Sequence, residues 1–97
     1  MKEAIIRKKA IRILNKKGFT CWYAPKAKFQ ECDLFSIWDI VCGKGGQFKW
    51  IQLTTLSNIS ARRKKINNYL AVNNIKFKQG EIWGWHKKLK VFKIINI

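Results

Sequence analysis

The acidic residues of this chain are few, and their placement is informative. Five Asp and Glu stand against 21 Lys and Arg, and three of the five fall within nine positions: Glu31, Asp33 and Asp39. A phosphate-binding surface gains nothing from carboxylates unless a cation lies between the two kinds of anion. Acids clustered in so basic a chain therefore favour a divalent metal site of the kind that cleaves phosphodiesters.

Asp39 gains partners if the glycines that follow it form a hairpin turn. With the turn centred between Gly45 and Gly46, Asp39 lies opposite Gln52 on the neighbouring strand. Thr54 shares the face of Gln52, because side chains alternate along a strand. The sequence thus predicts a carboxylate, an amide oxygen and a hydroxyl in one place. The alternative is that Asp39 binds a loop amide and Gln52 is an ordinary polar strand residue.

Other residues that could do chemistry have weaker cases. Asp33 falls in a predicted loop, residues 26–35, where reaching the metal of Asp39 and capping a turn explain it equally well. His86 has no second His or Cys at metal-ligand spacing and is predicted to end a strand in solvent. Trp83 and Trp85 share one strand face, which favours packing against a helix over stacking on bases.

Seven elements are predicted to position these residues, in the order α-β-β-β-α-β-β. Apolar residues at helical spacing, followed by Gly18, predict a basic amphipathic helix. Runs rich in β-favouring residues predict strands, and a Ser/Asn segment predicts the start of a second helix. The predicted helices cover residues 2–17 and 61–73, and the predicted strands cover residues 19–24, 37–42, 48–55, 81–86 and 89–95.

The second predicted helix begins with four consecutive cations and carries an apolar line that ends at Val72. Cations at a helix N-terminus oppose the helix dipole, so helix stability does not explain them. We interpret them as phosphate-binding residues, against the alternative of a solvated face. They are Arg62, Arg63, Lys64 and Lys65.

Composition limits the class of protein. The 97 residues support one domain over residues 1–97, and a hydrophobic content of 47% excludes a disordered basic tail. A formal charge of +16 attracts polyanions, of which nucleic acid is the commonest in a cell. No apolar run reaches the roughly 18–20 residues of a membrane span, and three cysteines without a CxxC pair argue against a disulfide framework and a zinc ribbon. We expect a cytoplasmic protein that binds nucleic acid and no membrane.

Short segments around Asp39 and Gln52 carry a family resemblance. Trp-Asp39-Ile-Val, a glycine hairpin and Ile-Gln52-Leu-Thr54 ahead of a basic helix resemble the PD-(D/E)XK nuclease superfamily. Within it the chain is similar to archaeal Holliday-junction resolvases and to small resolvase-like phage proteins. The phage group has a DLFxxxD motif, here from Asp33 to Asp39, and a QVT strand leading into an SARxxKI helix, here Gln52-Leu-Thr and Ser-Ala-Arg62. The resemblance implies a restriction-endonuclease-like α/β fold, a mixed sheet flanked by helices.

The resemblance also implies roles for single residues. Asp39 matches the metal-binding Asp, Gln52 the (D/E) position, and Glu3 the acid of the first helix. Mg²⁺ or Mn²⁺ would be held by Asp39 and Gln52, with Glu3 or Asp33 as a further ligand. Thr54 stands where the superfamily has its catalytic Lys, which orients the attacking water and stabilises charge on the phosphate.

The replacement of the catalytic Lys by Thr54 leaves two possible functions. The leading expectation is a DNA-binding, metal-dependent endonuclease in which Arg62 or Lys65 replaces the missing Lys, since Lys49 should face the other side of its strand. The alternative is a nucleic-acid-binding protein on the same fold that has lost cleavage. The sequence leaves the substrate open among branched, duplex and single-stranded DNA, and RNA. The resolvases it resembles act as homodimers. The expected nucleic-acid contacts are Arg62, Arg63, Lys64, Lys65, Arg7 and Lys8.

Overall fold

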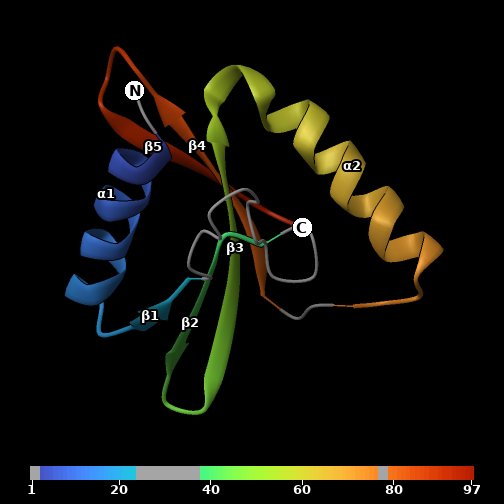
Figure 1. Ribbon diagram of the computed structural model, residues 1–97, viewed down its shortest axis with the longest axis horizontal. Helices are drawn as coiled ribbons and strands as arrows, with labels where there is room; N and C mark the ends of the chain where they lie inside the picture. Colours follow the sequence, from blue (N-terminus) through green and yellow to red (C-terminus); the bar gives the residue numbers. More distant parts are fainter. Residues whose placement is uncertain (1–2, 24–37, 77–78) are drawn as a thin grey trace, which may run out of the picture.

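The computed structural model of the chain describes residues 3–23, 38–76 and 79–97. Two helices accompany five strands, and the predicted order α-β-β-β-α-β-β is observed with one short 3-10 helix added (Figure 1). The predicted loop that holds Asp33 lies outside the described residues. The elements are α1 (Glu3–Lys16), β1 (Thr20–Trp22), β2 (Ile40–Lys44), β3 (Gln47–Thr55), η1 (Leu56–Asn58), α2 (Ile59–Val72), β4 (Gly80–His86) and β5 (Val91–Asn96).

The strands form one mixed sheet in the order β1-β2-β3-β4-β5. Neighbouring strands are antiparallel except for β3 and β4, which run parallel. A parallel pair needs a crossover connection, and here α2 supplies it between the end of β3 and the start of β4. The chain is therefore an α/β protein with a mixed sheet, as expected.

The β2–β3 hairpin has the predicted register. Gly45 and Gly46 form its turn with φ angles of 57° and 82°, a left-handed region that glycine enters at little cost. Lys44 pairs with Gln47 and Ile40 pairs with Ile51, so the pairing follows the count made from the glycines. β2 starts at Ile40, three residues later than predicted, so Asp39 immediately precedes the strand.

Each face of the sheet packs against its own helix (Figure 1). The α1 face buries Ile51, Leu53, Trp83 and Trp85 under the apolar stripe of α1, which confirms that the two tryptophans pack in the core. The other face, called here the α2 face, packs against α2. Its buried residues are Trp38, Ile59, Ile66 and Ile82.

The start of α2 lies very close to β4. A Cβ atom on Gly84 would collide with the side chain of Ile59, so only glycine allows this approach. The end of α2 lies away from the strands (Figure 1), and Val72 in its last turn is 76% exposed. The prediction that the apolar line continues to Val72 is therefore wrong: Tyr69 and Leu70 still pack against the α2-face cluster, but Val72 lies off their helical stripe. Neither of the helices that the structure describes is long and apolar enough to cross a membrane.

Candidate functional site

Asp39 and Gln52 meet on the α2 face, as the hairpin register predicts. The Gln52 side-chain amide donates a hydrogen bond to Asp39 Oδ2 at 3.2 Å. The main-chain N–H of Leu53 donates to the same oxygen at 2.7 Å. Both interpretations of Asp39 therefore hold in part: its carboxylate faces Gln52, and it also binds a backbone amide, which belongs to a strand instead of a loop.

The site is partly buried. Gln52 is 7% exposed and Thr54 is 9% exposed, whereas Asp39 is half-buried. A buried amide needs a hydrogen-bond partner, and Asp39 supplies one to Gln52. Thr54 lies two residues further along β3 and so shares the face of Gln52. The structure thus brings the side chains of Asp39, Gln52 and Thr54 to one side of the sheet, but the Gln52 group that meets the carboxylate is the amide N–H and not the predicted amide oxygen.

Lys49 lies on the opposite face, as expected. Its ammonium group is 3.4 Å from a carboxylate oxygen of Glu81 and 4.9 Å from the ring centre of Phe19, which packs in the α1 cluster. Glu81 in turn accepts a hydrogen bond from the Trp83 indole at 2.9 Å. Lys49 is therefore held on the face opposite Asp39.

The Asp39 carboxylate fits a hard cation such as Mg²⁺, which prefers oxygen ligands, but the Gln52 amide presents its N–H to Asp39 and would have to turn its oxygen inward to join it as a ligand. Among the residues that the structure describes, no group of three or more His, Cys, Asp or Glu could hold a metal ion. The described part of the site thus offers one carboxylate, Asp39, with its Oδ2 already bound to two N–H groups. Asp33 lies outside the described residues, and Glu3 begins α1, the helix that covers the other face.

The two predicted groups of nucleic-acid-binding cations lie on different helices. Arg62 to Lys65 occupy the first turns of α2, and their side chains form no ion pair within the described residues. Arg7 and Lys8 belong to α1, on the opposite side of the sheet, and line a groove of about 640 Å³ beside Tyr23. The Arg7 guanidinium lies 4.1 Å from the Tyr23 ring centre. The structure therefore separates these cations into two basic surfaces.

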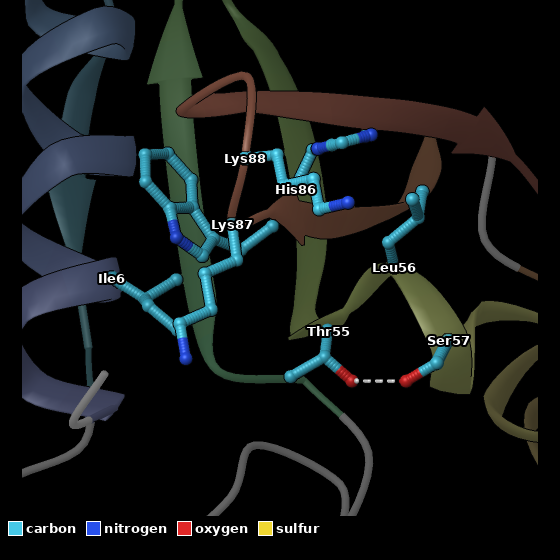
Figure 2. Close-up of a pocket in the computed structure, with 8 residues that line it drawn as sticks. Ile6, Thr55, Leu56, Ser57, His86, Lys87 and Lys88 are labelled. Carbon is cyan, nitrogen blue, oxygen red and sulfur yellow. Dashed lines mark hydrogen bonds between the residues drawn. The ribbon is translucent and has the colours of Figure 1, made fainter.

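A separate pocket of about 430 Å³ opens where the parallel strands β3 and β4 end (Figure 2). Thr55 and Ser57 contribute hydroxyls whose oxygens are 3.3 Å apart. His86 ends β4 as predicted, but it lines this pocket, half-buried, and its Nδ1 accepts the Leu89 N–H at 3.1 Å. Asp39 and Gln52 do not line the pocket, whose walls are Ile6, Thr55, Leu56, Ser57, Trp85, His86, Lys87 and Lys88.

Sequence reasoning missed two aromatic residues on the α2 face. Trp22 is 51% exposed and Phe48 is 62% exposed. Trp22 pairs with Val41, and Phe48 pairs with Gly43, so both share the face of Asp39. The signal for finding them was present, because the register that pairs Asp39 with Gln52 also assigns Phe48 to that face.

Comparison with family models, with curated protein sequences and with solved structures gives no match for this chain. The function must therefore be argued from the residues and their geometry.

Proposed function

We propose that this chain is a DNA-binding, metal-dependent phosphodiester hydrolase of the PD-(D/E)XK type. The observation that carries the proposal is the contact between Asp39 and Gln52, which lie opposite each other and are joined by a hydrogen bond of 3.2 Å from Gln52 Nε2 to Asp39 Oδ2. A carboxylate held beside an amide within a chain of charge +16 is costly for phosphate binding unless a cation uses it. The mixed sheet between two helices supports the proposal at the level of a mixed α/β fold, the class to which the restriction-endonuclease-like arrangement belongs.

In this proposal one group of residues binds the metal ion and another binds the phosphates. Asp39 and Gln52 would hold Mg²⁺ or Mn²⁺, with Asp33 as a further ligand. When bound, the cation would activate a water molecule and neutralise charge on the scissile phosphate. Arg62 and Lys65 lie in the first turns of α2, which follows β3 after one short 3-10 helix. Because α2 packs on the α2 face, these two cations would bind the nucleic-acid backbone on that side of the sheet.

A second candidate is a nucleic-acid-binding protein that does not cleave. Two observations favour it: Lys49 is paired with Glu81 on the other face, and Asp39 Oδ2 already accepts two hydrogen bonds from the protein. In this case Asp39 has a structural role in joining β2 to β3. The basic helices would then account for the whole function.

One experiment separates the candidates. Branched and linear DNA are incubated with the protein in Mn²⁺ and in EDTA, and binding is measured alongside cleavage. The hydrolase should cleave in Mn²⁺ only, and Asp39→Asn should abolish cleavage while DNA affinity is kept or raised, since a negative charge is lost near the phosphates. Glu81→Gln is the matched control, because it makes the same chemical change on the opposite face and should leave cleavage intact.

The other outcomes decide just as clearly. Binding without cleavage in any divalent metal would establish the second candidate. Metal-dependent cleavage that survives Asp39→Asn would remove Asp39 from the chemistry. A protein that binds no nucleic acid would refute both candidates.

A further inference from the structure

The α2 face carries an exposed aromatic surface beside the Asp39 site. We call it the aromatic face, and it consists of Trp22 on β1 and Phe48 on β3, with Val41 and Gly43 of β2 between them. Residues of the opposite parity, such as Cys21 and Cys42, pack under α1, which confirms that Trp22 and Phe48 point to the other side. α2 packs against β3 and β4, so within the described residues no helix covers this part of the α2 face (Figure 1).

Gly43 shapes this surface. A Cβ atom on Gly43 would lie 3.5 Å from the Phe48 ring, which is ordinary van der Waals contact. One edge of the Phe48 ring, at Cδ1 and Cε1, therefore lies against the glycine, and the side chain remains 62% exposed. An aromatic ring supported on one side and open on the other presents a flat π surface, which is the shape that a nucleic-acid base stacks on.

We propose that the aromatic face stacks unpaired bases of a nucleic-acid strand whose backbone passes the Asp39 site. The proposal rests on the function proposed above and names its substrate class: a strand with unpaired bases, such as a single strand or the open part of a branched DNA. A continuous duplex keeps its bases inside the helical stack and offers none to Trp22 or Phe48.

The charge of the protein favours a nucleic-acid strand over a second copy of the protein as the partner of the aromatic face. The chain carries a formal charge of +16, so two copies that met through this face would repel, whereas a polyanion is attracted. The cations of α2 follow the end of β3, whereas Phe48 lies near its start, roughly 23 Å away along the strand. A nucleic-acid strand several nucleotides long is therefore needed for its phosphates to bind these cations while its bases lie on the rings. Strand spacing and rise put Trp22 and Phe48 roughly 12 Å apart, which leaves room for more than one base.

The test compares three ligands of equal length at one salt concentration: a single-stranded oligonucleotide, its duplex, and an abasic single strand. Fluorescence anisotropy gives the Kd values of the wild type and of the double variant Trp22→Ala/Phe48→Ala. We expect the double variant to lose about tenfold or more in affinity for the single strand, and to bind the duplex and the abasic strand as the wild type does. Trp22→Phe with Phe48→Tyr keeps both rings and should restore the single-strand affinity.

Val72→Ala is the control, because Val72 is an apolar residue at the far end of α2 that is even more exposed, at 76%. Circular dichroism confirms that each variant is folded before binding is measured. Equal affinity of wild type and double variant for the single strand would overturn the inference while leaving duplex binding, and hence the proposed function, in place. A wild type that binds none of the ligands would refute both. A dimer that dissociates in the double variant would identify the aromatic face as a protein interface and also overturn the inference.

Discussion

The Asp39 carboxylate accepts the main-chain N–H of Leu53 at 2.7 Å, so a side chain at the start of β2 completes the hydrogen bonding of β3. Asp39 also donates its own N–H to the Ile51 carbonyl at 2.8 Å. Main chain and side chain together thus attach this residue to β3. A residue with a structural bond of this kind can be tested for stability independently of any chemistry.

Asp39→Ala should lower the free energy of unfolding by about 1–3 kcal/mol, because it leaves the Leu53 N–H without its acceptor. Asp39→Asn keeps an oxygen at the same place and should cost clearly less. Urea denaturation of the three proteins measures the difference. If the Ala and Asn variants are equally stable, the bond to Leu53 does not contribute to the fold.

The close approach of α2 to β4 gives a second prediction. Gly84→Ala should destabilise the protein by about 1–3 kcal/mol, because the new methyl group collides with Ile59 and a packed core resists extra volume. The same change should cost much less in an Ile59→Ala background, where the colliding atoms are gone. Gly43→Ala is the control, since its Cβ would meet Phe48 at an ordinary 3.5 Å. A Gly84→Ala variant as stable as the control would contradict this packing.

The β2–β3 hairpin and the pairing of Asp39 with Gln52 were predictable because they depend only on residues close together in the sequence. Two adjacent glycines with positive φ determine the turn, and the turn determines which residue lies opposite Asp39. Alternation along β3 then separates Gln52 and Thr54 from Ile51 and Leu53. The type and order of all seven elements follow from similar short-range patterns.

Which aromatic residues are buried and which are exposed was not predictable in this way. Trp22 and Trp83 both sit on strands, yet Trp22 is 51% exposed and Trp83 is 1% exposed. The difference arises because α1 covers the face of Trp83, whereas α2 does not reach the β1 side of the sheet. The pocket at His86 has the same kind of origin, because the parallel pairing of β3 and β4 brings Ser57 and Lys88 together from distant parts of the chain.

The Cys42 thiol predicts how stability changes in alkali. Burial, reinforced by the neighbouring Cys21, raises the pKa of Cys42 from 9.0 to about 12. Above pH 9 the thiol ionises in the unfolded chain but stays protonated in the folded one, so ionisation favours unfolding. The stabilising contribution of this group is thus complete below pH 9 and is lost as the pH rises toward 12.

Denaturant titrations of wild type and Cys42→Ala across this pH range isolate the effect, because lysine and tyrosine residues titrate in both proteins. The Ala variant is expected to be less stable at neutral pH, since Cys42 is 1% exposed in the core. Its stability should nevertheless fall less steeply with pH. Parallel pH profiles would show that the Cys42 thiol is not protected from ionisation.

The basic surface of α2 gives the last prediction, which concerns salt. Each Lys or Arg bound to a phosphate releases counterions from the nucleic acid, so affinity falls as salt rises, with a slope of about 0.9 per phosphate contact on duplex DNA. If Arg62, Arg63 and Lys65 bind phosphates, replacing all three by Ala should weaken binding and flatten the slope by about two to three.

The control replaces Lys87, Lys88 and Lys93 by Ala, which removes the same charge from the β4–β5 turn and β5, where all three are exposed. Long-range attraction falls equally in both variants, whereas direct contacts are lost only from α2. If the salt dependence of binding has the same slope in the two variants, total charge governs binding and α2 is not the interface. If the slope of the α2 variant equals that of the wild type, the interface lies instead at Arg7 and Lys8 on α1.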